Sequence, residues 1–225
     1  MKAFIIHLRE IESSLQSGLR LQNELNNIGI SAELFEGSYG DVTKKEYKKI
    51  GRKHHPWTFK GPNIILPEEY KKKQSTPGII GCFDSHYRLW KHCVELNEPI
   101  MIFEDDAHIY RKFIPVEWND VLSLVFSHKK KMNKYIKYLE TPEGKPEASF
   151  YKPASMPGNA GYAIKPHAAK ILVDTYKNSF LPADNAIMQH LVKIEIHNYM
   201  MGKAEPREKI GKSSSLIRTK YWNNK

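Results

Sequence analysis

The first part of the chain alternates between two patterns of hydrophobic and polar positions. Residues 3–6 form a short apolar run typical of a buried strand, and residues 32–35 repeat it. Between them, hydrophobic positions recur at helical spacing after Ser13 and Ser14, either of which could cap a helix. The opening of the chain therefore predicts a β-α-β unit.

The middle of the chain carries the sharpest pattern. Residues 37–77 lack a sustained period and contain Gly, Pro and Lys, with one short helical pattern at 67–73. Such a segment is typical of a long excursion near a functional site. A helix is then predicted from about residue 84 to 96, followed by an apolar strand over 100–103 that ends on three consecutive acids.

Shorter patterns complete the second half of the chain. They predict a helix within 121–126, strands at 135–139 and 158–164, a helix opened by Pro166, a helix over 184–192 and a last strand within 195–201. Neither a repeat nor a linker divides them, and 225 residues suffice for one α/β domain. We therefore expect residues 1–202 to form a single Rossmann-like domain, a mixed sheet flanked by helices, with a basic tail over 203–225.

Composition narrows the protein class. Hydrophobic residues make up 40% and charged residues 27% of the chain, which excludes disordered and fibrous proteins. Apolar runs fall short of the roughly 18 residues that span a bilayer, and the amino-terminal run is too short for a signal peptide. Cys82 and Cys93 have neither zinc-site nor disulfide-framework spacing. We expect a cytoplasmic protein with reduced, structural cysteines.

The net charge of +10 is unevenly distributed. Residues 41–75 carry ten Lys/Arg against four acids, residues 129–137 five against none, and residues 203–225 seven against two, so these stretches hold +16 and the remainder −6. Such stretches suit either a surface attracted to a polyanion, such as an acidic membrane or a phosphorylated glycolipid, or a set of solvated loops.

The strongest candidate for chemistry is the acidic triplet Glu104, Asp105 and Asp106. Ligands collect at the carboxyl ends of strands in open α/β sheets, and adjacent carboxylates repel unless a cation lies among them. Strand alternation directs Glu104 and Asp106 to one side and Asp105 to the other. Glu104 and Asp106 could therefore share Mg²⁺ or Mn²⁺ with substrate phosphates. The alternative is an acidic turn paired with Lys or Arg.

Other polar residues stand near predicted helix starts. Ser85 and His86 would lie where helix amides can meet phosphate, although a lone histidine such as His86 is more often a core or capping residue than a catalytic group. Asp184 suits either helix capping or general-base chemistry. A Gly-x-Gly-x-x-Gly phosphate loop is missing after the first strand, which argues against an NAD-dependent enzyme.

Taken together, these motifs resemble glycosyltransferase family 25, the bacterial lipooligosaccharide glycosyltransferases, which are related to collagen galactosyltransferases. The likeness rests on residues 76–86, Trp90, Pro99 and 102–106, and extends to Leu8-Arg9, 158–164 and 182–184. The segment His7-Leu8-Arg9-Glu10 differs from the fuller Asn-Leu-Asp-Arg-Arg pattern of many relatives.

The resemblance implies a GT-A type fold and an inverting transfer of a hexose from a UDP-sugar, with galactose favoured over glucose. It further implies a β-linkage to a lipooligosaccharide or other glycan acceptor, and Mn²⁺ or Mg²⁺ bound by Glu104 and Asp106. Asp184 and Asp105 become the candidate catalytic carboxylates. The candidate nucleotide-sugar contacts are His7, Leu8, Arg9, Gly81, Ser85, His86, Glu104, Asp105, Asp106, Asn159 and Gly161.

Two other functions remain open from the residues alone. Lys-rich segments interleaved with Tyr and Trp suggest a nucleic-acid-binding module, and the acidic strand end would also serve a metal-dependent phosphohydrolase. Neither explains the combined motifs, so we expect no nucleic-acid partner. We expect the basic tail to hold the enzyme peripherally on the cytoplasmic face of an anionic inner membrane.

Overall fold

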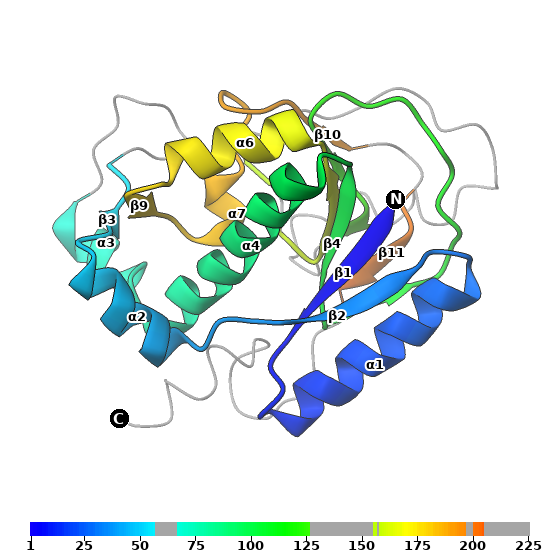
Figure 1. The fold of residues 1–225 in the computed structure, drawn as a ribbon, viewed down its shortest axis with the longest axis horizontal. Coiled ribbons are helices and arrows are strands. Elements are labelled where there is room, and N and C mark those ends of the chain that lie inside the picture. Colours follow the sequence, from blue (N-terminus) through cyan, green and yellow to red (C-terminus); the bar gives the residue numbers. More distant parts are fainter. Residues whose placement is uncertain (57–66, 127–154, 157, 197–199, 205–225) are drawn as a thin grey trace.

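The computed structural model describes residues 1–56, 67–126, 155–156, 158–196 and 200–204 (Figure 1). Its centre is a six-stranded sheet of order β10-β6-β8-β4-β1-β2. These strands are β1 Lys2–His7, β2 Ala32–Glu36, β4 Ile100–Glu104, β6 Val121–Ser123, β8 Gly161–Ile164 and β10 Ile194–Ile196. β1, β2 and β4 run parallel, whereas β8 runs antiparallel to both β4 and β6. The expected mixed α/β sheet is confirmed.

Two small sheets accompany the central one. β5 (Ala107–Ile109), β11 (Gly202–Ala204) and β7 (Val125–Phe126) form the first, and β3 (Lys53–His54) pairs with β9 (Ser179–Phe180) in the second. β11 therefore takes up the start of the expected basic tail, and residues 205–225 lie outside the described residues.

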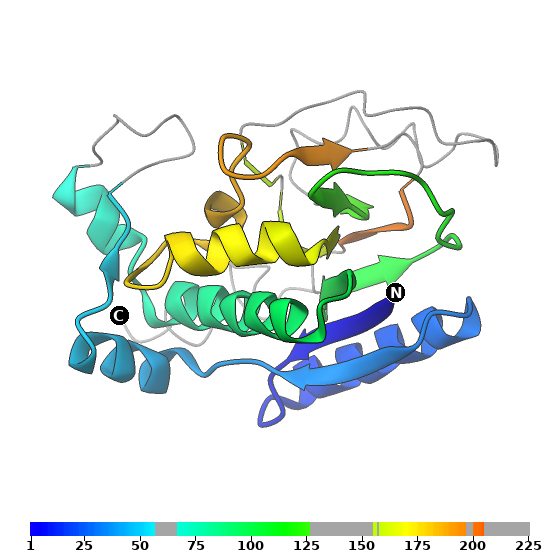
Figure 2. The ribbon, with the colours of Figure 1, turned by 45° about the horizontal axis from the view of Figure 1, so that its top comes forward.

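Helices cover both faces of the central sheet. The described helices are α1 Glu12–Asn27, α2 Gly40–Lys49, α3 Glu68–Lys73, α4 Pro77–Leu96, α6 Pro166–Thr175 and α7 Ala183–Ala186. α1 lies on one face, while α4 and α6 lie side by side on the other, as Figures 1 and 2 both show. Each face has its own hydrophobic core, one with the buried face of α4 and one with that of α1.

Alternation along β4 connects the two cores to the acidic triplet. Ile100 and Ile102 belong to the core under α4, whereas Met101 and Phe103 belong to the core on the α1 side. Successive side chains of a strand point to opposite faces. The Glu104 side chain therefore points toward α4, and that of Asp105 points toward α1.

Several predicted elements are corrected. Residues 121–126 form strands β6 and β7 rather than a helix, because the segment is buried from both sides and a short continuous apolar run does not distinguish the two. Of the predicted 184–192 helix, only residues 184–186 are helical, as part of α7 (Ala183–Ala186). Ile187 and Met188 instead pair with residues 155 and 156. The strand predicted at 135–139 lies outside the described residues.

The start of α4 is the correction that matters for the site. The helix begins at Pro77, with Thr76 as its N-cap residue, about two turns before the predicted start at residue 84. Proline at the first helical position loses no hydrogen bond and has a suitable φ, so Pro77-Gly78 opens the helix where it was expected to form a turn. Ser85 and His86 therefore lie inside α4, away from its first amides.

Candidate functional site

The carboxyl ends of three parallel strands meet at one edge of the sheet. His7 at the end of β1 is in register with Glu36 at the end of β2, and Ile6 is in register with Glu104 at the end of β4. The backbone N–H of Glu104 also donates to the carbonyl of Ala160, which immediately precedes β8. The acidic triplet thus stands where residues from distant parts of the chain converge.

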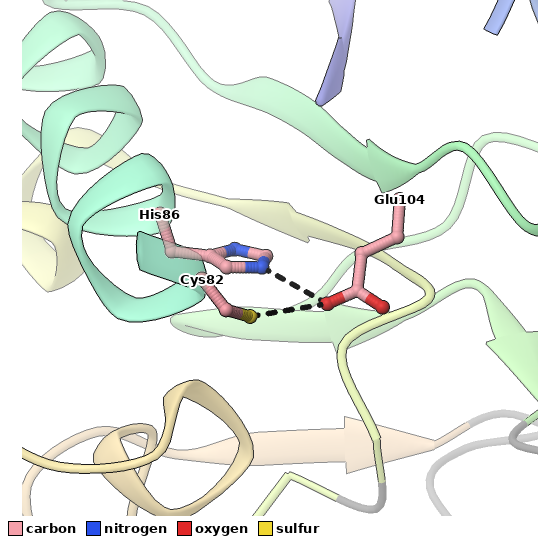
Figure 3. Close-up of side chains that lie close together, drawn as sticks. All are labelled: Cys82, His86 and Glu104. Atoms are coloured by element: carbon pink, nitrogen blue, oxygen red, sulfur yellow. Dashed lines mark hydrogen bonds and ion pairs between the residues drawn. The ribbon is translucent and has the colours of Figure 1, made fainter. Parts of the chain in front are cut away.

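Glu104 turns toward α4 and meets two of its side chains (Figure 3). Its Oε1 lies 3.3 Å from Nε2 of His86 and accepts a hydrogen bond from the thiol of Cys82 at 3.7 Å. His86 is fully buried, whereas the Glu104 side chain is 31% exposed. Glu104 therefore connects a buried polar cluster to the surface.

A buried chain of hydrogen bonds orients the His86 imidazole. The indole N–H of Trp90 donates to the hydroxyl oxygen of Tyr162 at 2.9 Å, and this hydroxyl lies 2.9 Å from Nδ1 of His86. Since an indole only donates, the Tyr162 proton remains for Nδ1, and the imidazole proton is then assigned to Nε2. His86 accordingly donates to Glu104 and positions its carboxylate.

The pKa of the Cys82 thiol depends on burial and on three carboxylates. Burial raises the pKa of its thiol well above the ordinary value, and the charges of Glu104, Asp184 and Asp106 raise it further. The charges of Asp106 and Asp184 thus act on the same thiol as the charge of Glu104. Glu104 itself faces the Cys82 side of the sheet, as strand alternation predicts.

Asp105 points to the opposite side. Its carboxylate accepts a short hydrogen bond from the hydroxyl of Ser14 in α1, and the same hydroxyl accepts the backbone N–H of Leu8 at 2.9 Å. Ser14 lies within α1 and does not cap it, because the N-cap residue is Ile11. Asp105 therefore fastens the loop after β1 to the end of β4.

Gly81 and Ser85 face the interior. The Ser85 hydroxyl accepts the N–H of Ser38 at 2.8 Å and donates to the carbonyl of Gly81 at 2.7 Å. A Cβ on Gly81 would lie 2.5 Å from the carbonyl oxygen of Ser38, so only glycine allows this close approach. Both residues hold the segment after β2 against α4, and the structure gives them no route to phosphate through helix amides.

Asp84 also holds the segment after β2 against α4. The sequence did not indicate this role. The Asp84 carboxylate accepts hydrogen bonds from the hydroxyls of Ser38 and Tyr47, each at 2.6 Å, and lies 3.9 Å from Nη1 of Arg52. Burial and the Asp84 charge raise the pKa of Tyr47. This cluster joins α2 and β3 to α4 and so fixes one wall of the sheet edge.

Two buried side chains at this edge have polar atoms without a partner among the described residues. Neither amide atom of Asn159 makes a hydrogen bond, and the same holds for Nδ1 of His7, while each residue is only 4% exposed. Burial lowers the pKa of His7, against the opposing charges of Glu36 and Asp105. A ligand at this edge would supply the missing partners.

The remaining predicted contacts differ in exposure. Arg9 is exposed and lies 3.8 Å from Glu36, whereas Leu8 is half-buried. Gly161 is buried, and a Cβ there would lie 2.5 Å from a methyl of Val125 and 2.6 Å from the Phe103 ring. Gly161 therefore serves the packing of β8, and Arg9 is accessible from solvent.

One group of three possible metal ligands stands out among the described residues: Cys82, His86 and Glu104 bring a sulfur, a nitrogen and an oxygen within 4.8 Å of one another. Glu104 and Asp106, the pair expected for Mg²⁺ or Mn²⁺, offer the carboxylate oxygens that a hard cation prefers. The charges of Asp106 and Asp184 act on the Cys82 thiol, as that of Glu104 does. Cys82 was expected to be only structural, although its position four residues before His86 is a signal for a shared helix face.

Among the described residues, no helix is both long and apolar enough to cross a membrane.

Comparisons with known proteins identify a family: the model described as glycosyltransferase family 25 (LPS biosynthesis protein) matches residues 1–187.

Curated relatives agree with this match. A "Glycosyltransferase 25 family member" of Aedes aegypti is 28% identical over 45% of the chain, and "Procollagen galactosyltransferase 1-A" of Xenopus laevis is 29% identical over 47%. "Lipooligosaccharide biosynthesis protein lex-1" of Haemophilus influenzae is 29% identical over 64%. The alignments cover 16% of each of the first two relatives and 52% of the third.

Proposed function

The chain belongs to glycosyltransferase family 25, and we propose that it transfers a hexose from a UDP-sugar to a glycan acceptor. The observation that carries the proposal is the convergence of the acidic triplet with the two unpartnered buried side chains, Asn159 and His7, at one sheet edge. Ligands of α/β sheets bind at this edge. A nucleoside diphosphate sugar brings hydrogen-bonding groups for these two side chains, and its diphosphate could share a divalent cation with the acidic triplet.

In the proposed complex, Glu104 and Asp106 hold Mn²⁺ or Mg²⁺ together with the donor diphosphate. When bound, the cation neutralises negative charge on the departing diphosphate. His86 supports this arrangement from beneath, because its Nε2–H fixes one carboxylate oxygen of Glu104. In Figure 3 the other oxygen of Glu104 points away from His86 and Cys82, as a second ligand direction requires.

Asp184 is the proposed general base. Its position at the start of α7 and its effect on the Cys82 thiol support a place beside the acidic triplet. The base would take the proton of the acceptor hydroxyl while the hydroxyl oxygen bonds to the anomeric carbon. The bond from that carbon to UDP breaks, and UDP leaves with the electron pair. Attack from the face opposite UDP inverts the centre and produces a β-linkage from an α-linked donor.

Asp105 is the weaker candidate for the base. Its carboxylate is already engaged by Ser14, whose hydroxyl also holds Leu8. We therefore assign Asp105 a positioning role and keep His7, Leu8 and Arg9 as donor contacts after β1.

The relatives' names guide the choice of donor and acceptor. One relative is named a procollagen galactosyltransferase and another a lipooligosaccharide biosynthesis protein. We propose galactose as the donor sugar and a lipooligosaccharide as the acceptor. The basic stretches would hold the enzyme on the cytoplasmic face of an anionic inner membrane, where a lipid-linked acceptor is presented.

The proposal is tested by incubating the chain with UDP-galactose, UDP-glucose, a lipooligosaccharide acceptor and Mn²⁺. We expect metal-dependent formation of a β-linked product, lost in Asp184→Asn and retained in Asp174→Asn, a matched change of an α6 carboxylate paired with Lys170. Phosphate release without a glycosylated product would instead identify a phosphohydrolase. Salt-sensitive binding of an unrelated duplex, without transfer, would favour the nucleic-acid alternative.

A further inference from the structure

Three different metal-ligand atoms converge beneath the acidic triplet. Cys82 and His86 are four residues apart on α4, so both side chains lie on one helix face. Glu104 reaches them from the end of β4, and Sγ, Nε2 and the carboxylate oxygen all lie within 4.8 Å of one another (Figure 3). This combination is independent of the oxygen ligands proposed for the diphosphate-bound cation, apart from the shared Glu104.

Two of the three separations are close to those of a tetrahedral zinc site. Zinc–sulfur bonds of about 2.3 Å and zinc–nitrogen or zinc–oxygen bonds of about 2.0 Å, at tetrahedral angles, separate sulfur from oxygen by about 3.5 Å and nitrogen from oxygen by about 3.3 Å. The observed distances are 3.7 Å from Sγ to Oε1 and 3.3 Å from Nε2 to Oε1. The third pair, Sγ and Nε2, lies within 4.8 Å, and side-chain rotation would bring it to the roughly 3.5 Å that the same bond lengths require.

The chemistry of the donors selects the metal. Thiolate and imidazole bind Zn²⁺ well, whereas Mg²⁺ prefers oxygen ligands throughout. A ligating histidine usually donates its second ring N–H to an oxygen, which fixes the ring. Here the Tyr162 hydroxyl oxygen lies 2.9 Å from Nδ1 and is itself held by Trp90. The exposed part of Glu104 leaves the cluster accessible from solvent.

We propose that Cys82, His86 and Glu104 form a Zn²⁺-binding site with a water molecule as the fourth ligand. On binding, the Cys82 thiol releases its proton to solvent, and the imidazole takes the tautomer protonated at Nδ1. This N–H then donates a hydrogen bond to the Tyr162 oxygen, whose own O–H turns away from the ring. Zn²⁺ would draw Glu104 away from the diphosphate-bound cation, so zinc would inhibit transfer. This inhibition rests on the proposed function, whereas the site itself does not.

Co²⁺ is the probe for the site, because thiolate ligation gives it an intense near-ultraviolet charge-transfer absorption. The full chain, without a histidine tag and with a non-thiol reductant, is titrated with Co²⁺ and then with Zn²⁺. We expect one thiolate-bound Co²⁺ per chain, displaced by one equivalent of Zn²⁺. Cys82→Ser should abolish the band, and Cys93→Ser, which changes the other free cysteine, should retain it.

Tyr162→Phe tests the orientation of His86. Loss of an outer-shell partner weakens metal binding by roughly 10- to 100-fold, so Zn²⁺ affinity should fall by that factor while the thiolate band persists at saturating Co²⁺. Circular dichroism of each variant checks that it is folded. A wild-type chain without the band, or a folded Cys82→Ser variant that keeps it, would overturn the site. Zinc binding in a chain that transfers no sugar would instead overturn only the proposed function.

Discussion

Replacing Asn159 with Leu should improve stability and impair donor binding at the same time. Asn159 is 4% exposed, and neither its amide nitrogen nor its amide oxygen has a partner among the described residues. Leucine has the same number and branching of side-chain atoms but no polar group to desolvate. Asn159→Ala accompanies it, so that overpacking by the bulkier methyl groups can be recognised.

The two effects have estimable sizes. A buried polar atom without a partner costs about 1–3 kcal/mol. Ordered water relieves part of such a cost, so we expect the free energy of unfolding to rise by about 1–2 kcal/mol, or roughly 2–8 °C in Tm for a chain of this length. A hydrogen bond from Asn159 to a charged group of UDP would contribute about 1.5–3 kcal/mol. Its loss should lower the affinity for UDP roughly 10- to 100-fold.

Tyr162→Phe provides the control with the opposite sign. The Tyr162 hydroxyl is bonded to both Trp90 and His86, and its removal leaves two buried nitrogen groups without a partner. We expect a loss of about 2–4 kcal/mol. Urea unfolding measures stability, and calorimetric titration with UDP and Mn²⁺ measures affinity. If Asn159→Leu and Asn159→Ala both lose more than about 1 kcal/mol, or bind UDP as the wild type does, the assignment of Asn159 to the donor is wrong.

Four further predictions follow from the site and the charge distribution. Asp106→Ala should abolish Mn²⁺-dependent UDP binding, measured by calorimetry, and unchanged binding would remove Asp106 from the metal site. Micromolar Zn²⁺ should inhibit sugar transfer by the wild type and by the control variant Cys93→Ser, but not by Cys82→Ser. Equal inhibition of all three proteins would contradict a Glu104 shared between the two metals. Burial lowers the pKa of His55 to about 4, so between about pH 6.5 and 4 the unfolded chain binds more protons than the folded one. The free energy of unfolding should therefore fall by up to about 3 kcal/mol as the pH drops through this range. Urea unfolding of His55→Gln should show a weaker pH dependence than the wild type. Deleting residues 205–225 should weaken sedimentation with acidic vesicles but spare transfer to a soluble acceptor, and undiminished vesicle binding would exclude the tail as an anchor.

Local patterns were sufficient for much of the fold. The period-2 and period-3.6 signals located β1, α1, β2 and β4 because each of these elements buries one or both faces against a core. The patterns failed at 121–126, where a few buried residues satisfy either a strand or a helix, and at 184–192, where the helix ends at Ala186. Length could not separate the two, since such short segments derive their conformation from their neighbours.

The candidate site shows the same division. Strand alternation alone predicted that Glu104 and Asp105 point to opposite faces, because the direction of successive side chains is a local property of the backbone. The position of Ser85 and His86 was misjudged, because α4 begins at Pro77 and carries both residues two turns inside the helix. Both residues are buried, where Ser85 holds the segment after β2 and His86 orients the Glu104 carboxylate.

The sequence by itself determined the family resemblance, the strand that ends in three acids and the opposite directions of Glu104 and Asp105. Only the tertiary structure decided which groups meet: Cys82 and His86 with Glu104, Ser14 with Asp105, and the unpartnered Asn159 beside the end of β4. The physical reason is that these contacts join residues from different elements. Their distances depend on how α1 and α4 pack on the two faces of the sheet, which neither local spacing nor composition specifies.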